Sequence, residues 1–306
     1  MSTQTTARHG AAGPEMRKRS HPLRWVAGVL IIAVVAGIVY AMAQAKIIWP
    51  DVANYIVSPN MVQAVWKTVL LAVISQVIAV VLGVIVAVLR ISANPVARNA
   101  AWVYIWLFRG VPVLLQILIW YNLSMVVDRI TIPSPFGGVL FTSTTNDLMT
   151  PFMAALLGLA LNESAYMAEI IRSGIKSVDH GQIEAAGALG MSPARTMCKI
   201  VLPQAMRVII PPTGNDFINM LKTTSLASVI TYEELLRAAQ NISSRNLQVM
   251  ETLFAAGFWY MVVVSVTGVG QYYLERAYDV SAPGAKSASV SILRTILRPP
   301  MKRSKA

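Results

Sequence analysis

Carboxyl, amide and phenol groups stand inside two long apolar runs in the second half of the chain, where ionisable side chains are costly and therefore rare. In each run the polar residues recur at positions i, i+4 and i+7, which places them on one face of a helix. The two polar stripes and their acidic neighbours are Asn162, Glu163, Tyr166 and Glu169 in the first run, and Asn215, Asp216, Asn219 and Lys222 in the second. If the stripes face each other, they line a path for a zwitterionic solute, with the carboxylates near its ammonium group.

The same residues also admit purely structural roles. Glu169 and Arg172 are three residues apart and can pair with each other on one helix. Arg109, which interrupts an earlier apolar run, can pair with Glu163 or Asp216. The amides and the acid of the second stripe can hydrogen-bond between helices. The sequence leaves the transport and the structural interpretations side by side.

The chain lacks the residue patterns of a catalytic centre. Its only cysteine is Cys198, and two of its three histidines, His9 and His21, stand in the N-terminal tail, which leaves no intrachain disulfide and no basis for a metal site. No nucleophile and base stand at a suggestive spacing. No G-x-x-x-x-G-K-[ST] sequence occurs, so a phosphate-cradling loop is missing as well. We expect no enzyme activity, no metal and no cofactor in this chain.

The elements that position the polar residues are predicted to be membrane-spanning helices. Hydrophobic residues make up 55% of the 306 and charged residues only 13%, against about 25% in soluble domains. A helix needs about 20 mostly apolar residues to cross the bilayer core. Six runs qualify, at residues 25–45, 62–89, 100–125, 151–171, 205–221 and 253–273. The first run is longer than the apolar part of a signal peptide, so we expect a permanent anchor. Pro211 and Pro212 are expected to interrupt the fifth span and to free backbone carbonyls.

The formal charge of +12 is explained by topology rather than by nucleic acid. Basic residues gather before the first run, after the last run, and in the connections that follow the second and fourth runs. The positive-inside rule then places both termini in the cytoplasm of a multi-pass protein of the bacterial plasma membrane. Residues 126–150 are expected outside as an irregular loop, and residues 231–250 as an outer segment that includes a short helix.

A polar, helix-forming segment at residues 179–203 separates the fourth and fifth runs and lies on the cytoplasmic side in this topology. Asp179 can cap a helix, and its alanines favour helix. Gly187 and Gly190 each cost about 1 kcal/mol in a helix interior, and Ser192 precedes a proline that can restart a helix. We expect a short helix, a turn at Gly190 and a second helix, which form a compact knob for the groove of another protein.

The spacing within this segment carries a family resemblance. The residues concerned are Glu184, Ala185, Ala186, Gly187, Gly190, Ile200, Leu202 and Pro203. Their pattern resembles the cytoplasmic coupling signature of the membrane subunits of bacterial ABC importers. Further stretches are similar to the permeases for polar amino acids: WKTVLLAVISQVIAVVLGVIVAVLR, FRGVPVLLQILIWYN, NESAYMAEIIRSGIKSVDHGQIEAAGALGMS and LPQAMRVIIPPTGNDFINMLKTTSL. The resemblance covers about residues 60–279. Val111 and Ser173 depart from it, because the family often has threonine and glycine at these positions.

The resemblance implies an all-α integral membrane protein with the type I importer fold. Its transmembrane domain, residues 60–279, would be a five-span core, to which residues 25–45 add a sixth span, between basic cytoplasmic tails at 1–24 and 280–306. The implied partners are cytoplasmic ATPases that bind ATP and magnesium, an external solute-binding protein, and a second permease subunit that is either identical or different. ATP-driven closure of the ATPases would move the coupling segments together and open the path outward.

Three other functions are alternatives to this interpretation of the sequence. A permease of the same architecture could import methionine, a compatible solute or an inorganic anion; the NESAYMAEI and RGVP stretches favour amino acids. An ion-driven secondary carrier is a different class, and many such carriers consist of repeated halves, which this chain lacks. A membrane scaffold or sensor leaves the polar residues within several spans unexplained.

Overall fold

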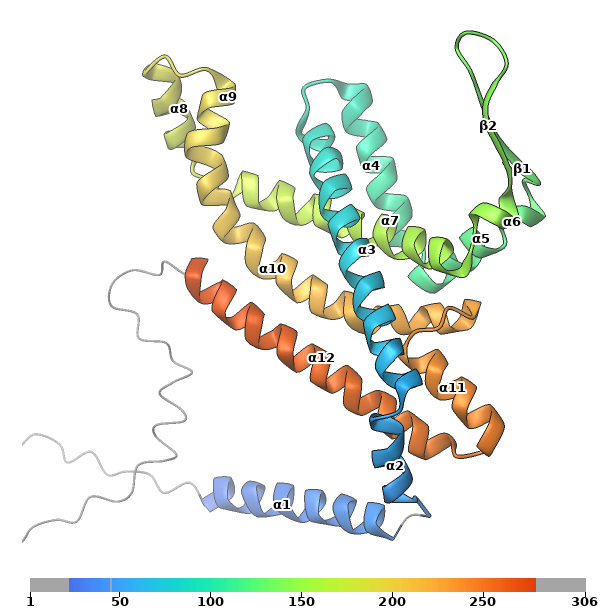
Figure 1. Ribbon diagram of the computed structural model, residues 1–306. Coiled ribbons are helices and arrows are strands. Elements are labelled where there is room, and N and C mark those ends of the chain that lie inside the picture. Colours follow the sequence, from blue (N-terminus) through green and yellow to red (C-terminus); the bar gives the residue numbers. More distant parts are fainter. Residues whose placement is uncertain (1–21, 45, 279–306) are drawn as a thin grey trace, which may run out of the picture. The chain divides into compact units, whose positions relative to one another are not determined.

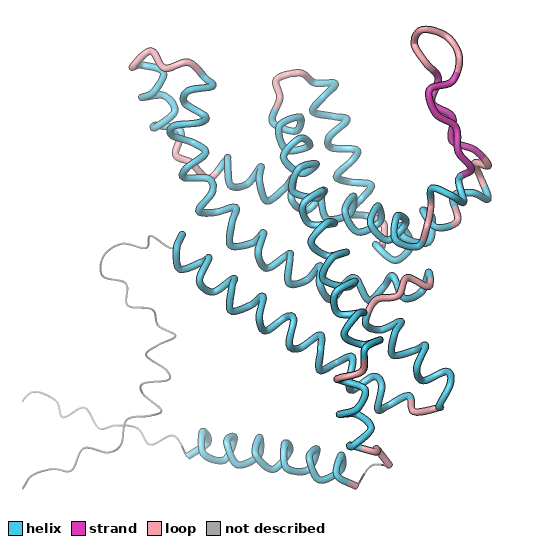
Figure 2. The backbone as a smooth tube through the Cα atoms, viewed as in Figure 1, coloured by secondary structure: helices cyan, strands magenta, loops and turns pink. Residues whose placement is uncertain are grey.

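The computed structural model describes residues 22–44 and 46–278, and almost all of its elements are helices (Figures 1 and 2). The described chain divides into two units, and the boundary between them in the sequence falls between Ile48 and Trp49. The basic tails expected at residues 1–24 and 280–306 lie, apart from residues 22–24, outside the described part.

The first unit is essentially one helix, α1 (Pro22–Ala43). From Trp25 to Tyr40 almost every side chain is exposed, although nearly all of them are apolar. A helix that is apolar on all sides and unburied within its own chain suits a lipid environment. Residues Trp25–Ala43 are long and apolar enough to cross a membrane, which agrees with the first predicted span.

The second unit is organised around two long helices, α3 (Pro59–Ile91) and α7 (Pro151–Lys176). Ser58 caps α3 by accepting a hydrogen bond from the Met61 amide. The two helices approach closely at Gly83, where an added Cβ would lie 2.6 Å from the Cβ of Met167. Small buried residues of both helices form the core, so α7 and its polar stripe are held firmly against α3.

The third predicted span, residues 100–125, is broken rather than continuous. Helices α4 (Pro95–Gly110) and α5 (Val113–Tyr121) meet at an angle of 98°. Pro112 has no amide hydrogen to donate and disfavours the helical region for the residue before it, and Val111 is extended at φ −97° and ψ 130°. The break was not predicted from the sequence, and the bent pair can still form one span.

Residues 126–150 were predicted as an irregular loop, and this prediction was also wrong. Strands β1 (Arg129–Pro133) and β2 (Val139–Thr144) pair as an antiparallel hairpin between the turn η1 (Leu123–Met125) and the short helix α6 (Thr145–Leu148). Gly137 and Gly138 have positive φ in its turn, where only glycine is free of strain. The Ser, Thr, Pro and Gly content that suggested a loop here serves a hairpin turn and its short strands.

The remaining elements carry the other polar residues of interest. In chain order they are α2 (Trp49–Ile56), α8 (His180–Ala188), α9 (Pro193–Thr196), the π-helical turn η2 (Met197–Val201), α10 (Leu202–Thr223), the 3-10 turn η3 (Thr224–Ile230), α11 (Leu235–Asn246) and α12 (Val249–Tyr278). Helix α10 packs on α7 and α12, and α11 packs on α3 and α12. The helix predicted within residues 231–250 is present as α11, and its outer location stays a prediction. Helix α10 runs through Pro211 and Pro212 without a break, so the predicted interruption is absent.

The count of six spans is not confirmed. Four helices of the described chain are long and apolar enough to cross a membrane, and α4 with α5 makes five if the bent pair is one span. Helix α10, expected as the fifth span, is not among them. Its polar stripe and its two prolines lower its apolar character, and such a helix is better suited to line a polar interior than to face lipid.

Candidate coupling and translocation sites

The segment predicted to contact another protein forms a compact hairpin, here named the coupling hairpin (residues 179–203). The Asp179 side chain accepts a hydrogen bond of 2.7 Å from the Gly181 amide and caps α8, as expected. The Met191 amide donates to the Ala186 carbonyl at 3.0 Å and the Gly190 amide donates to the Gly187 carbonyl at 2.9 Å. With Gly190 at φ +73°, these two bonds form a Schellman helix end. The chain then restarts at Ser192 as α9, as predicted.

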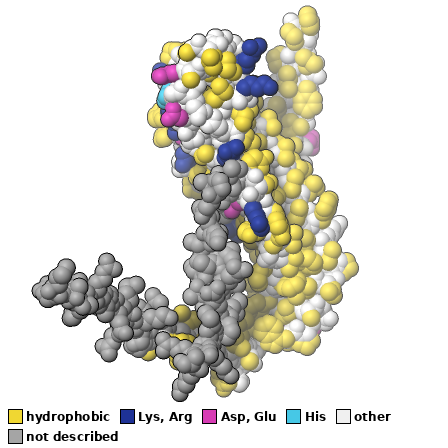
Figure 3. All heavy atoms as spheres, turned by 90° about the vertical axis from the view of Figure 1, so that its left-hand side faces the viewer, with side chains coloured by type: hydrophobic (Ala, Val, Ile, Leu, Met, Phe, Trp, Pro, Cys, Tyr) yellow, Lys and Arg dark blue, Asp and Glu magenta, His cyan; other side chains and the backbone are white. Residues whose placement is uncertain are grey.

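Most of the residues predicted for coupling are accessible on this hairpin. Of the eight, those classed as exposed are Glu184, Ala185, Gly187, Gly190, Leu202 and Pro203. Ala186 is buried and Ile200 half-buried, so these two support the hairpin from within. The view onto α8 and α9 shows acidic, basic and apolar side chains sharing one small face (Figure 3). The arrangement suits a protein partner, although contact with one remains a prediction.

Two features of the hairpin escaped the sequence reasoning. Leu189, directly before the turn, is 82% exposed, which is a large apolar surface for the tip of a polar hairpin. Gln204 on α10 donates at 2.6 Å to the Gln182 side chain on α8 and at 2.8 Å to the Ile200 carbonyl. This amide ties the hairpin directly to the helix that carries the second polar stripe.

Amide side chains hold the break between α4 and α5. Gln116 donates to the Phe108 carbonyl at 2.9 Å and to the Val111 carbonyl at 2.8 Å, and Asn162 donates to the Phe108 carbonyl at 2.7 Å. Carbonyls left without helical partners at a helix end need such donors when they are shielded from water. Asn162, predicted for the substrate path, thus has a structural task. Gln116 was missed, and its position as the one polar residue in the run VLLQILIWY was the available signal.

Arg109, beside the break, does not pair with either predicted acid. Its guanidinium lies over the ring of Tyr166, 4.8 Å from the ring centre, in a cation–π contact. Glu169 and Arg172 form the predicted ion pair, with Oε2 and Nη2 2.5 Å apart. Both residues share with Arg109 and Tyr166 a shallow cavity of about 510 Å³. The remaining lining residues are Arg90, Trp102, Ile105, Trp106 and Gly110. Three guanidinium groups and one carboxylate give this cavity a net positive lining.

The two acids of the stripes come together where α7 packs on α10. The carboxyl groups of Glu163 and Asp216 are close enough to interact with each other. Glu163 Oε1 and Asp216 Oδ2 are buried, and neither has a hydrogen-bond donor within the described chain. Buried carboxyl oxygens without donors are costly, so a proton on one of the two carboxyl groups would lower the repulsion between them. These two residues are 53 positions apart in sequence and meet only through the fold.

The predicted picture of two facing stripes is only partly realised. Asn215 and Asn219 are exposed on α10, and Tyr166 is 39% exposed beneath Arg109. The residues that face the opposite helix are the acids beside the stripes, Glu163 on α7 and Asp216 on α10. The amides of α10 are thus free for a partner subunit or a solute rather than for α7.

A further polar contact fixes α10 from its other side. Gln271 of α12 donates to the Pro211 carbonyl at 2.9 Å, and an added Cβ at Gly214 would lie within 3 Å of its side-chain atoms. This contact joins α12 to α10 directly beside the proline pair, and the missing side chain of Gly214 makes room for it.

The chain is similar to a known protein family and to individual transport proteins. A family model described as "Binding-protein-dependent transport system inner membrane component" matches residues 79–280. The chain is 42% identical over 267 residues to the arginine transport system permease protein ArgU of Corynebacterium glutamicum, covering 87% of this chain and 83% of the relative. It is 34% identical over 196 residues to the histidine/lysine/arginine/ornithine transport system permease protein HisM of Escherichia coli, covering 64% of this chain and 79% of that protein.

Solved structures agree with these relatives. The crystal structure of an amino acid ABC transporter with histidines is similar at a TM-score of 0.65 and 32% identity, covering 76% of this chain and all of that chain. An inward-facing MetNI methionine ABC transporter is similar at a TM-score of 0.58, covering 72% of this chain and 96% of that chain, but at 16% identity this likeness concerns the fold alone.

Proposed function

Because the chain belongs to the family of binding-protein-dependent transport system inner membrane components, we propose that it divides the work of import between its coupling hairpin and its buried carboxyl pair. It is a membrane permease subunit of an ABC importer for amino acids. As such a subunit it works in the inner membrane with an ATPase and a substrate-binding protein. The assignment of tasks to particular residues is our proposal.

Energy enters, on this proposal, through the coupling hairpin. The exposed Glu184 and the small residues around it fit a groove of the ATPase. ATP and magnesium are bound by the ATPase and not by this chain. The observation that carries this step is the Gln204 contact between α8 and α10, because it joins the exposed hairpin to a helix of the path. The hairpin and both chain termini are then cytoplasmic, in line with the distribution of basic residues.

Substrate is handled, on this proposal, where Glu163 and Asp216 meet. A basic amino acid carries two cations, its ammonium group and its side chain, and two carboxylates can neutralise both. The relatives named for arginine and for histidine, lysine, arginine and ornithine support a basic substrate, and arginine is the first to test. The exposed Asn215 and Asn219 are assigned to the wall of the path, with Tyr166 and Asn162 near its inner end.

The second permease subunit is proposed to cover α10 and α12, the helices that carry exposed polar and apolar faces side by side. Only 11% of the most apolar window of α12 is buried within the chain. A second copy of this chain and a different permease are both compatible with this surface. The outer side of α3, where large apolar side chains are exposed, is assigned to lipid.

The test is uptake by the purified assembly. The permease is reconstituted into vesicles with its ATPase and binding protein, and labelled arginine, histidine, glutamine and methionine are supplied outside. ATP-dependent accumulation of arginine, lost when a non-hydrolysable ATP analogue replaces ATP, is expected. Accumulation of methionine or of no amino acid would refute the proposed substrate class, and ATP-independent accumulation would refute the mechanism.

A further inference from the structure

A polar cavity separate from the sites above lies between the first turns of α3 and helix α11. It has a volume of about 450 Å³, within the range of small-ligand sites. We name it the α3–α11 pocket. Its polar lining residues are Asn60, Gln63, Lys67, Glu233, Asn241, Arg245 and Asn246. None of the residues assigned above to coupling or to the path contributes to it.

The pocket lies at the end of the second unit away from the coupling hairpin. Figure 1 shows α11 beside the start of α3, whereas α8 and α9 lie at the opposite end. With 33 residues, α3 is about 50 Å long, and the hydrocarbon core is about 30 Å thick, so the ends of α3 extend beyond it. In the proposed orientation the pocket opens on the outer face, from which the importer is loaded.

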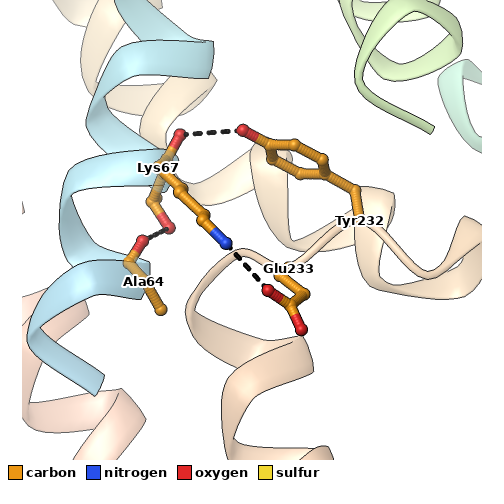
Figure 4. Close-up of polar contacts among 5 residues, drawn as sticks. Ala64, Lys67, Tyr232 and Glu233 are labelled. Atoms are coloured by element: carbon orange, nitrogen blue, oxygen red, sulfur yellow. Dashed lines mark hydrogen bonds and ion pairs between the residues drawn. The ribbon is translucent and has the colours of Figure 1, made fainter. Parts of the chain in front are cut away.

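One wall of the pocket carries an ion pair of opposite charges from distant parts of the chain. Lys67 Nζ lies 2.8 Å from Glu233 Oε2, and the side chains are 32% and 60% exposed (Figure 4). The lysine holds the pKa of the Glu233 carboxyl below its usual range, so the carboxylate is ionised at neutral pH. An ion pair this exposed contributes little to stability, and a ligand that offers each partner an opposite charge can replace it.

The backbone around this ion pair is fixed. The Tyr232 hydroxyl donates to the Lys67 carbonyl at 3.4 Å, as Figure 4 shows. The Leu235 amide donates to Thr68 Oγ1 at 3.1 Å, and Thr68 in turn donates to the Ala64 carbonyl at 2.9 Å. These bonds lock the chain before α11 onto α3. The two charges are therefore presented on a rigid frame, which lowers the entropy cost of binding a small molecule.

Several polar groups of the lining have no partner within the described chain. The side chains of Asn60, Gln63, Asn241 and Arg245 make no hydrogen bond or ion pair there, whereas Asn246 donates to the Tyr55 hydroxyl at 2.6 Å. A guanidinium group presents paired N–H donors that match a carboxylate. With Lys67 and Glu233, the free Arg245 gives the lining two positive charges and one negative charge.

We propose that the α3–α11 pocket binds a free amino acid by its charged head group, with Arg245 and Lys67 on the carboxylate and Glu233 on the ammonium. When the ligand binds, the ion pair between Lys67 and Glu233 opens, and each of the two side chains pairs with the opposite charge of the ligand. The free amides of the lining contact the side chain of the ligand. The proposal rests on amino acids being the transported solutes. It adds an outer site, distinct from the Glu163–Asp216 pair, that holds the solute before it enters the path.

The test is local protection of a single cysteine. Cys198 is replaced by serine, the apolar lining residue Ile242 is replaced by cysteine, and the permease–ATPase assembly is reacted in nanodiscs with a small thiol reagent. Arginine is expected to slow the labelling of this cysteine at least fivefold. Agmatine, which is arginine without its carboxylate, is expected to have no effect. A cysteine at Thr131 on the exposed hairpin serves as the control and should label at one rate throughout.

Matched substitutions locate the bound ligand. Arg245→Gln should abolish the protection, and Arg129→Gln, the same change at an exposed position outside the pocket, should preserve it. Protection should also survive Asp216→Asn, because binding in the path is not required. The proposal is overturned if no amino acid in a panel protects, if agmatine protects as well as arginine, or if Asp216→Asn removes protection. ATP-dependent uptake by the same assembly separates the outcomes: uptake without protection refutes only the outer site, and loss of both refutes the proposed function as well.

Discussion

Adding one methyl group at either of two glycines of the coupling hairpin should have opposite effects. Gly190 has φ +73°, and Gly187, three residues earlier, lies in the helical turn that ends α8. At neither position would an added Cβ meet another atom within 4 Å. Contacts therefore do not differ between Gly190→Ala and Gly187→Ala, and only the backbone preference of alanine remains.

The magnitudes follow from that preference. Alanine in the left-handed region costs about 1–2 kcal/mol, so Gly190→Ala should destabilise the helix end by this amount. Alanine in a helix is favoured over glycine by up to about 1 kcal/mol, so Gly187→Ala should stabilise it. Since about 1.4 kcal/mol is a factor of ten, local opening should become about 5–30 times more frequent in the first variant. In the second it should become up to about 5 times rarer.

Amide hydrogen exchange measures this opening where it occurs. The reporters are the amides of Leu189, Gly190 and Met191, which bond to the Ala185, Gly187 and Ala186 carbonyls. Their exchange in the isolated permease should accelerate in Gly190→Ala and slow in Gly187→Ala, with no change in amides of α3. A shift in the same direction for both variants would refute the backbone explanation. An ATPase activity that follows the exchange rates would connect the hairpin to coupling.

Three further outcomes are expected. Glu163→Gln should reduce uptake at least tenfold while the variant still copurifies with the ATPase, and unchanged transport kinetics would contradict its place in the path. Glu234→Ala removes the cap of α11 and leaves the Tyr260 hydroxyl without its acceptor. In a thermal unfolding assay this variant should lose about 2–4 kcal/mol of the free energy of unfolding. The control variant Glu233→Ala, at the exposed neighbouring position, should lose under about 1 kcal/mol. Because Lys67 lowers the pKa of Glu233 from 4.5, the stability that this ion pair contributes is present above about pH 4.5 and lost as the pH falls through the lowered value. The difference in unfolding temperature between the wild type and Glu233→Gln should shrink only below that pH.

Local structure in the coupling hairpin followed the prediction from the sequence, whereas the β-hairpin at Arg129–Thr144 was predicted as an irregular loop. The cap at Asp179, the turn at Gly190 and the restart after Ser192 were all predicted, because each depends on groups within five residues. The proline effects were harder to predict. Pro112 breaks a span as its chemistry allows, yet Pro211 and Pro212 lie inside an unbroken helix that packs against α7 and α12.

By itself the sequence determined the membrane environment, the helical class, the coupling hairpin and the membership in the importer family, because these depend on composition, short-range spacing and long matched stretches. Only the tertiary structure decided which polar groups meet. It joined Glu163 to Asp216, turned Asn162 toward the helix break and set Lys67 against Glu233. The physical reason is that a buried polar group takes its partner from whichever helix packs against it. That packing depends on close approaches such as Gly83 against Met167, which no local pattern reveals.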